Sequence, residues 1–408
     1  AGNGDHQGSG RVGGDGVMAK VKDIAMQIRG VSYHPEDLHD NLDEDSVVLL
    51  RANNIKDGKL ILDDVVYVSK SKVAEQQYLQ TGDILICASS GSKELVGKAA
   101  FVDLVKNPMT FGAFCKVVRP QPEYSEYLGH YFNSPVYRRK ISALSAGANI
   151  NNIKNEHIDN LDIQLVDEKE RREIITILNE LNMLISLRKQ QLFKLDELVK
   201  ARFVEMFGDC KTNPKNWKTK ALEKIANVGS SKRVFVEELQ DSGIPFYRGT
   251  EIGALAEKKA VIPALFITEE HYKQLCETTG KPQKGDLLMP SICPDGRIWI
   301  VDTDESFYFK DGRVLWVHLT SANYNSVFLL YTLKDRIMTD YASIASGTTF
   351  AELKIFALKK CKIFDVPLEL QNQFANFVER VDQQKQTVQQ SLEKLELMKK
   401  ALMQEYFG

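Results

Sequence analysis

Hydrophobic residues along this chain gather in short runs that predict strands and in longer periodic stretches that predict helices. Runs rich in Val, Ile, Leu and Phe, bounded by turn-forming residues, are typical of strands. In the first half they cover 47–51, 83–87 and 98–103, and in the second half 286–289, 298–302 and 314–318. A helical pattern covers 125–142. We therefore expect an α+β fold class with globular domains of mixed α/β structure.

Each half of the chain ends in a long stretch with a period of 3.5 residues. From Ile174 to Met206, alternating steps of four and three residues meet ten positions, of which eight are apolar. The same steps from Phe374 to Tyr406 again meet eight apolar residues in ten. This period predicts a helix whose apolar seam needs a partner helix. We expect two paired helices, 168–206 and 367–406, and these coiled-coil interface residues: Leu178, Leu181, Ile185, Leu192, Leu195, Val378, Val381, Val388, Leu392 and Leu395.

Short connections favour the antiparallel arrangement of these helices. The alternative is that each helix packs only on its own domain.

The two halves also repeat each other in sequence. The string SAGANINNIKNEHIDNLDI from Ser145 matches IASGTTFAELKIFALKKCKI from Ile344, and GDILICAS from Gly82 matches GDLLMPS from Gly285. Both long helices close on the dipeptide Phe-Gly, at 207–208 and 407–408. A repeated unit of domain size indicates a pseudo-twofold protein.

These patterns divide the chain into six segments. The first 17 residues hold seven glycines and read as a tag-like, disordered tail. A polar segment with one proline separates the two halves and is typical of a linker. The predicted boundaries are 1–17 for the tail, 18–165 for the first domain, 166–208 for the first helix, 209–217 for the linker, 218–365 for the second domain and 366–408 for the last helix.

Composition adds limits on function. The chain is 43% hydrophobic and 26% charged, and its formal net charge is −2. These values are ordinary for a soluble globular protein and argue against nonspecific nucleic-acid binding by the whole surface. No apolar run is long enough to span a membrane, and no signal peptide is visible. The six cysteines are scattered and none forms a CxxC pair, so the sequence predicts neither a zinc site nor a disulfide framework. Such cysteine usage fits a reducing compartment, and we therefore expect a cytoplasmic protein.

Polar side chains beside the predicted strands are suited to DNA recognition. Arg and Asn side chains recognise guanine and adenine edges, whereas Lys and hydroxyl groups hold phosphates. The candidate DNA-binding residues are Arg51, Asn53, Asn54, Ser90, Ser92 and Lys93 in the first domain, and Lys232, Arg233, Arg248, Thr250, Ser291 and Arg297 in the second. The alternative is that these residues only form polar turns and strand ends. The two sets differ, as two domains that recognise different sequences would require, although loops also diverge in any repeated protein.

The sequence lacks the catalytic motifs of several enzyme classes. The segment from Gly91 to Ala99 does not fit a Walker phosphate-binding loop, and there is no HExxH string. No Asn-Pro-Pro-aromatic or Asp-Pro-Pro-aromatic string of an adenine methyltransferase is present. We therefore expect a chain that is not itself an enzyme.

Several strings in the same order and spacing resemble the specificity subunit of type I restriction–modification systems. In the first copy they are GDILICASSGS from Gly82, FNSPVYRRKISALSAGANINNIKNEHIDNLDI from Phe132 and VDEKERREIITILNEL from Val166. The second copy supplies GDLLMPS, YTLKDRIMTDYASIASG and VPLELQNQFANFVERV from Val366. The resemblance extends over residues 18–408. The combination of order, spacing and repetition of these strings makes it specific.

The resemblance implies two target-recognition domains separated by two long helices that form an antiparallel coiled coil. Each domain would recognise one half of a bipartite, asymmetric site in double-stranded DNA. A helix of about 39 residues spans roughly 58 Å, so the coiled coil could set the spacer between half-sites. Two methyltransferase subunits would dock on this chain, and restriction subunits could join them. The cofactors S-adenosylmethionine, ATP and Mg would belong to those partners, and none to this chain.

Two other functions stay open at this point. One is the specificity subunit of a related system whose methylase and nuclease are fused in one polypeptide. The other is a coiled-coil assembly scaffold without DNA recognition. The scaffold would show no sequence-dependent DNA binding, and neighbouring genes would identify the fused system.

Overall fold

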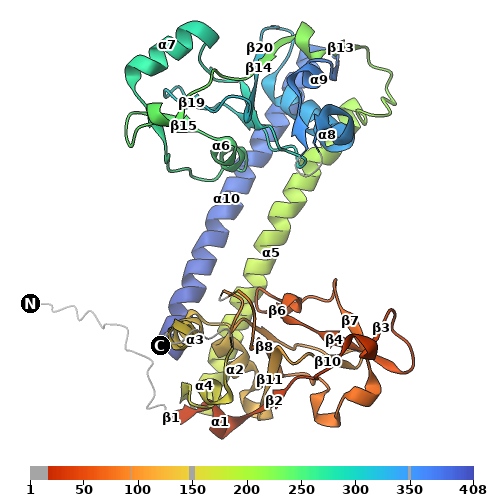
Figure 1. The fold of residues 1–408 in the computed structure, drawn as a ribbon, viewed down its shortest axis with the longest axis vertical. Coiled ribbons are helices and arrows are strands. Elements are labelled where there is room, and N and C mark those ends of the chain that lie inside the picture. The colour runs from red at the N-terminus through yellow and green to blue at the C-terminus, as the bar shows by residue number, and fades with distance from the viewer. Residues whose placement is uncertain (1–16, 93, 147–151, 348–350) are drawn as a thin grey trace, which may run out of the picture. The chain divides into compact units, whose positions relative to one another are not determined.

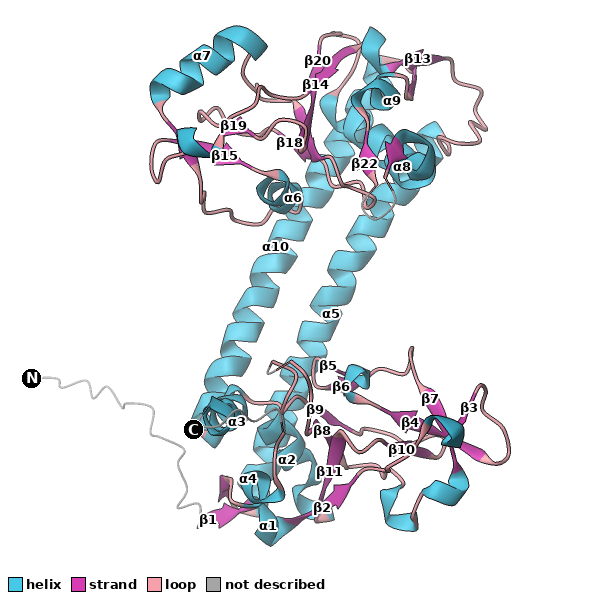
Figure 2. Ribbon diagram, in the orientation of Figure 1, coloured by secondary structure: helices cyan, strands magenta, loops and turns pink. Residues whose placement is uncertain are grey.

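The computed structural model describes residues 17–92, 94–146, 152–347 and 351–408. The chain forms two compact units, each with a mixed α/β domain and parts of both long helices (Figures 1 and 2). The first unit holds residues up to Lys189 together with Gln389–Gly408, and the second unit holds Gln190–Val388. Thus the structural division runs through both helices, whereas the sequence pattern assigned each helix to a segment of its own.

The first unit is built around two four-stranded sheets. One has the order β2 (Ala25–Arg29), β11 (Cys115–Pro120), β8 (Ile84–Cys87) and β9 (Ala99–Phe101), all antiparallel. The other has the order β10 (Met109–Phe111), β4 (Ser46–Leu50), β7 (Val66–Ser69) and β3 (Leu38–His39), with β10 parallel to β4. The smaller elements are β1 (Val17–Lys20) paired with β12 (Asp162–Leu165), β5 (Ile55–Lys56) paired with β6 (Lys59–Leu60), and helices α1 (Val21–Ile24), α2 (Ser125–Phe132), α3 (Pro135–Ala146) and α4 (Asn155–Asp159).

The second unit repeats the strand order of the first main sheet and has a smaller second sheet. Its main antiparallel sheet has the order β14 (Ala226–Gly229), β20 (Val314–Leu319), β17 (Leu287–Pro290) and β18 (Trp299–Ile300). A second sheet has the order β16 (Phe266–Ile267), β15 (Ile244–Tyr247) and β19 (Tyr308–Phe309), with β19 parallel to β15. The other elements are β13 (Thr219–Ala221) paired with β23 (Lys362–Phe364), β21 (Ala345–Ser346) paired with β22 (Glu352–Leu353), and helices α6 (Gly249–Ala256), α7 (Glu269–Thr279), α8 (Ser326–Ile344) and α9 (Ile355–Lys359).

The two long helices have equal length and an offset of 200 residues. Helix α5 covers Glu168–Phe207 and helix α10 covers Leu368–Phe407, with 40 residues each. Within the first unit, Lys189 Nζ lies 2.9 Å from Glu396 Oε1, and within the second, Lys385 Nζ lies 2.6 Å from Asp196 Oδ1. Both contacts fit antiparallel helices. All ten of the predicted interface residues are buried or half-buried.

The carboxyl end of each helix packs into a core. Phe407 lies 5.1 Å from Tyr127 and 5.8 Å from Tyr131, ring centre to ring centre, in the first unit. Phe207 lies 4.8 Å from Phe328 in the second unit. Both phenylalanines are buried. The repeated Phe-Gly dipeptide therefore fixes a helix end in each unit.

Three segments differ from their sequence-based predictions. The predicted helix 125–142 is divided into α2 and α3, because Pro135 begins a new helix. Val17 pairs with Leu165 in β1, so the predicted tail is one residue too long. The predicted linker 209–217 packs on the second core, since Cys210 is buried and the Trp217 indole donates a 3.0 Å hydrogen bond to the Phe207 carbonyl.

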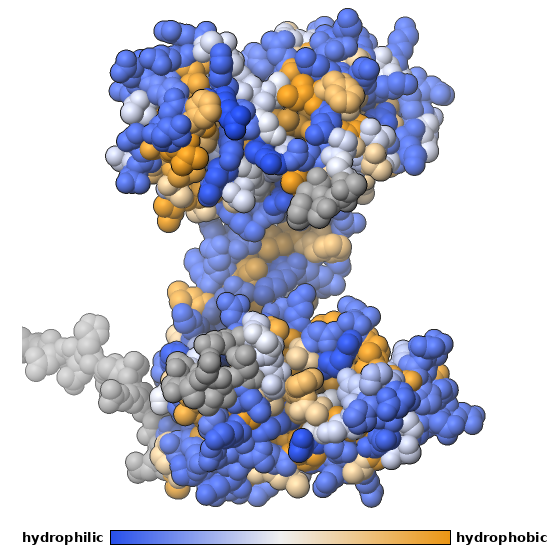
Figure 3. Space-filling view, viewed as in Figure 1, coloured by the Kyte–Doolittle hydropathy of each residue, from blue (hydrophilic) through white to orange (hydrophobic). Residues whose placement is uncertain are grey.

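The rest of the predicted tail, residues 1–16, lies outside the described residues. Over the part of the chain that the structure describes, no helix combines the length and the hydropathy needed to cross a bilayer. Figure 3 shows polar residues over most of the visible surface of each domain, with smaller apolar patches between them.

Candidate nucleic-acid interface

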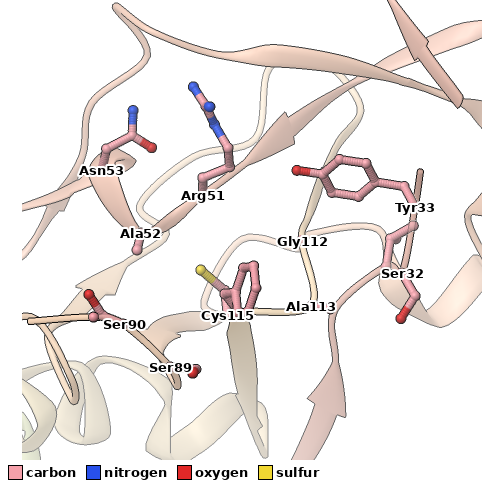
Figure 4. Close-up of a pocket in the computed structure, with 13 residues that line it drawn as sticks. Ser32, Tyr33, Arg51, Ala52, Asn53, Ser89, Ser90, Gly112, Ala113 and Cys115 are labelled. Carbon is pink, nitrogen blue, oxygen red and sulfur yellow. The ribbon is translucent and has the colours of Figure 1, made fainter. Parts of the chain in front are cut away.

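A pocket in the first unit brings together loops from four strands. It has a volume of about 690 Å³ and is lined by residues of the segments 31–33, 51–53, 89–91 and 112–115 (Figure 4). These segments follow the carboxyl ends of β2, β4, β8 and β10. The sheets thus place side chains that are far apart in the sequence around one opening.

Arg51 and Asn53 are held side by side at this pocket by one carboxylate. Arg51 Nη2 donates to Asp64 Oδ1 at 3.1 Å, and Asn53 Nδ2 donates to Asp64 Oδ2 at 2.7 Å. Asn53 is exposed and Arg51 is half-buried. A guanidinium carries five N–H donors, so this ion pair leaves donors for a base edge or a phosphate.

Asn54 has a structural role. It is 1% exposed, and its Oδ1 accepts a 2.8 Å hydrogen bond from the Arg51 backbone N–H. Its Nδ2 donates to the carbonyl oxygens of Ile61 and Asp64 at 2.8 and 2.9 Å. Both the amide oxygen and the amide nitrogen form hydrogen bonds within the loop, so we withdraw Asn54 from the candidate DNA contacts.

The serine loop after β8 contributes one side of the pocket. Ser90 lines the pocket, and its Oγ accepts a 3.2 Å hydrogen bond from the Ser92 backbone N–H. Ser92 is exposed. Lys93, the third candidate of this loop, lies outside the described residues.

Arg248 takes the place of Arg51 in the second unit. Each arginine directly follows its strand, β4 or β15, and donates its backbone N–H to the side chain three residues on. In the second unit that side chain is Glu251, whose Oε1 also lies 2.5 Å from Arg248 Nη2. Burial acts to raise the pKa of Glu251, but hydrogen bonds from Arg248 and Thr250 and backbone amides lower this pKa to about 2. The carboxylate is therefore ionised at neutral pH.

Thr250 lies in a helix and not in a polar turn or at a strand end. Residues Gly249–Ala256 form α6, with Arg248 at its N-cap. Glu251 stabilises this helix start because a carboxylate at the third position can accept from the N-cap N–H. Thr250 is exposed, but its Oγ1 donates to Glu251 Oε2 at 2.8 Å.

The remaining candidates of the second unit divide into exposed and buried groups. Arg297 Nε lies 2.7 Å from Asp295 Oδ2. A Cβ added at Gly253 would lie 3.0 Å from Arg297 Nη1, so Arg297 packs closely on α6. Lys232 and Arg233 are exposed, and the Arg233 guanidinium lies 5.4 Å from the Phe235 ring centre. Ser291 is 2% exposed, so we withdraw it from the candidate contacts.

Three residues at these sites were not among those predicted from the sequence. Asp64 orients two candidates, and Tyr33 and Phe114 line the pocket. None of them stands out by type or motif in the sequence. Alignment of the two halves strand by strand would have drawn attention to Phe114, because its partner position in the second half is an arginine.

The residues that line the pocket offer hydrogen-bonding groups and apolar surface. Its only sulfur group is the thiol of Cys115, and burial raises the pKa of this thiol to about 12. A protonated, buried thiol is a poor nucleophile. Within the described ranges, no cluster of three or more His, Cys, Asp or Glu side chains is placed to hold a metal ion.

The structure thus defines a class of protein with two repeated α/β domains, each with an arginine at the end of a strand, and two long antiparallel helices. A family model described as "Type I restriction modification DNA specificity domain" matches residues 20–197 and again 214–397. The chain therefore belongs to this family, and each match covers one domain together with most of a long helix.

Comparison with individual proteins is consistent with this family assignment. The chain is 40% identical over 185 residues to the type I restriction enzyme EcoKI specificity subunit of Escherichia coli K12; the match covers 45% of this chain and 40% of that relative. The crystal structure of the type I restriction–modification S subunit from M. genitalium has a TM-score of 0.53 at 14% identity and covers 98% of both chains. A structure from work on assembly and conformational transition of the type I R-M system has a TM-score of 0.57 at 16% identity, covering 96% of this chain and 98% of that one. At these identities the two structures support the fold alone.

Proposed function

We propose that this chain is the DNA-recognising subunit of a type I restriction–modification complex. Each α/β domain binds one half of a bipartite, asymmetric site in double-stranded DNA. The observation that carries this proposal is the presence of two DNA specificity domains on one chain, each with an arginine held at the carboxyl end of a strand. The complex acts on DNA in the cytoplasm.

In the first half-site, Arg51 and Asn53 contact base edges. Asp64 fixes both side chains before DNA arrives, so little side-chain entropy is lost on binding. Arg and Asn match the acceptor pattern of guanine and the donor–acceptor pattern of adenine in the major groove. Ser90 and Ser92 are suited to phosphate contacts beside them.

In the second half-site, Arg248 and Arg297 take this role. Their carboxylate partners Glu251 and Asp295 hold the guanidinium groups in the same manner as Asp64. Lys232 and Arg233 are exposed and can neutralise phosphates.

The long helices provide the surface for the other subunits. In the first unit, helix α5 exposes four large apolar residues, namely Ile177 at 39%, Met183 at 57%, Leu184 at 39% and Leu187 at 50%. Exposed apolar surface of this kind is typical of a docking site. Two methyltransferase subunits dock on the helices and supply S-adenosylmethionine binding and adenine methylation. Restriction subunits that use ATP and Mg join this core, and the present chain catalyses neither reaction.

Selection of DNA from a random library tests the proposal. The chain is purified with the methyltransferase subunit from its own genome, and bound DNA is recovered and sequenced over several rounds. We expect one asymmetric motif of two short parts with a fixed gap. Recovery of random sequences by an assembled, folded complex would contradict the proposal. A complex with Arg51→Ala and Arg248→Ala serves as the matched control and should enrich the motif less strongly, with discrimination weakened in both half-sites.

A further inference from the structure

The internal repeat aligns Phe114 of the first unit with Arg313 of the second. In the first unit, the Ala88 N–H donates to the Phe114 carbonyl at 2.9 Å. In the second unit, the Ser291 N–H donates to the Arg313 carbonyl, also at 2.9 Å. The next pairs along the strands are Cys115 with Cys87 and Val314 with Pro290.

A second pair of hydrogen bonds supports this alignment. The Ile153 N–H donates to the Ala88 carbonyl and the Leu353 N–H donates to the Ser291 carbonyl, both at 2.7 Å. The backbone around residues 114 and 313 is thus held in the same way in both units. The two positions share a scaffold and differ in their side chains.

Both positions lie beside the arginine that the two units have in common. Phe114 and Arg51 line the same pocket. In the second unit, a Cβ added at Gly249, the residue after Arg248, would lie 3.2 Å from the Arg313 carbonyl oxygen. Residue 114 therefore lies at the site of a proposed base contact, and the backbone of residue 313 lies beside the residue that follows Arg248.

The side chains at these positions are available to a ligand. Phe114 is 71% exposed, so a ligand that covered its ring would remove apolar surface from water, which is favourable. The side chain of Arg313 is 56% exposed and forms an ion pair with Glu352. Asp64 holds Arg51 in a comparable way, with a carboxylate beside a guanidinium that keeps further donors.

We propose that residues 114 and 313 determine the difference in DNA specificity between the two domains. Phe114 makes an apolar contact with a thymine methyl group next to the base pair contacted by Arg51. Arg313 donates hydrogen bonds to a guanine next to the base pair contacted by Arg248. The inference rests on the proposed function and adds two residues that determine specificity. The physical basis is the pairing of apolar side chains with thymine and of guanidinium groups with guanine in the major groove.

The test measures binding of the complex with its methyltransferase subunit to the selected site and to all single base-pair changes of it. Phe114→Ala should lose discrimination at one base pair of the first half-site by roughly tenfold. Phe114→Arg should change the preferred base there, and both variants should leave the second half-site unaltered. Leu104→Ala, which removes an apolar side chain that is 61% exposed elsewhere in the first unit, is the control and should bind like the wild type.

Arg313 needs a control for its ion pair. Arg313→Ala should relax one base pair of the second half-site by a similar factor. Glu352→Gln breaks the same ion pair but keeps the guanidinium, so its preferred bases should match those of the wild type. Loss of discrimination in Glu352→Gln equal to that in Arg313→Ala would overturn the assignment of Arg313.

Two outcomes distinguish failure of this inference from failure of the proposed function. If the wild-type complex selects a bipartite site and folded complexes with Phe114→Ala and Phe114→Arg recognise it unchanged, the inference alone is overturned. A wild-type complex that selects no bipartite site would overturn the proposed function, and this inference with it. Thermal unfolding and copurification with the methyltransferase subunit confirm that each variant is folded and assembled.

Discussion

At the scale of single residues, the two units keep one backbone arrangement and change its chemistry. Arg51 and Arg248 follow equivalent strands and donate their backbone N–H groups to residues three positions on. The acceptor is Asn54 in one unit and Glu251 in the other. The loop is thus stabilised in both, while the groups offered to DNA differ. This is the behaviour expected of a repeated scaffold that recognises two different half-sites.

Replacing Arg51 by alanine should weaken recognition of the first half-site only. The expected loss is about 1–3 kcal/mol against the correct base, the range for a bidentate contact. Lys106→Ala removes the same charge from an exposed position of the first unit and should have a much smaller effect. Titration of the complex with its selected DNA measures both. Equal losses for the two variants would show that Arg51 acts only through its charge.

His130 should make the stability of the first unit depend on pH. Burial lowers its pKa from 6.5 to about 4, and a 3.0 Å hydrogen bond with Asn179 opposes this only in part. Between these two values a proton binds the unfolded chain and not the folded one. The free energy of unfolding should therefore fall as the pH drops from 6.5 to about 4, by up to about 3 kcal/mol, and should lose nothing from this group above 6.5.

The matched variant is His130→Gln, which keeps a polar group opposite Asn179 but does not titrate. Hydrogen exchange of β8 and β11 in rising urea, at about pH 7.5 and about pH 5, measures the stability of the first unit. The wild type should lose more stability between the two pH values than the variant does. The same loss in both proteins would assign the pH dependence to other groups.

Residue type alone could not separate functional from structural side chains. Asn53 and Asn54 are neighbours of identical type, yet one is exposed beside Asp64 and the other is buried as a loop cap. Asn serves both purposes because its amide can donate and accept. Phe114 was missed for a related reason, since an exposed phenylalanine and a core phenylalanine look the same in a sequence.

At the scale of elements, the ends of the long helices are parts of the domain cores. Phe207 belongs to the second unit, although its helix begins at Glu168 in the first. Phe407 belongs to the first unit, although its helix begins at Leu368 in the second. Each core is thus completed by a helix that begins in the other unit.

Truncation of either phenylalanine should therefore destabilise one unit selectively. Phe207→Ala should destabilise the second unit and Phe407→Ala the first, each by about 3–5 kcal/mol. All three tryptophans, Trp217, Trp299 and Trp316, lie in the second unit, so their fluorescence reports its unfolding. The transition should shift to lower urea in Phe207→Ala, and hydrogen exchange of β8 and β11 should accelerate in Phe407→Ala. A reversed assignment, or equal effects on both units, would contradict the packing described.

Periodic elements were predicted well and irregular ones were not. The seven-residue period placed both long helices within one residue of their ends, because a long seam leaves little freedom in register. Helices α6 and α7 were not predicted, because they are short and have no counterpart of equal length in the first half. Helix α6 also depends on a local cap at Glu251. The break at Pro135 was also missed, although proline is common at a helix start.

At the scale of the whole molecule, each of the two long helices contributes residues to both units. We expect their length to set the spacer of the DNA site. Removing seven residues from each, 186–192 and 386–392, keeps the heptad phase and shortens each helix by about 10 Å. Since base pairs rise about 3.4 Å each, the gap between half-sites should shorten by roughly three base pairs.

Motif selection on the shortened complex measures this gap. Removal of residues 186–192 alone is the control, and it should impair assembly because the remaining helix has no matching partner seam. An unchanged gap in a folded complex with both deletions would show that the helices do not set the spacer.

A map of modified adenines tests most directly whether this chain directs a methyltransferase to a bipartite DNA site. The chain is expressed with the methyltransferase subunit from its own genome in a host without other DNA methyltransferases, and the host DNA is sequenced for methylated adenine. We expect one asymmetric motif in two parts with a gap of fixed length. Methylation without a motif, or no methylation from an assembled complex whose methyltransferase binds S-adenosylmethionine, would contradict it.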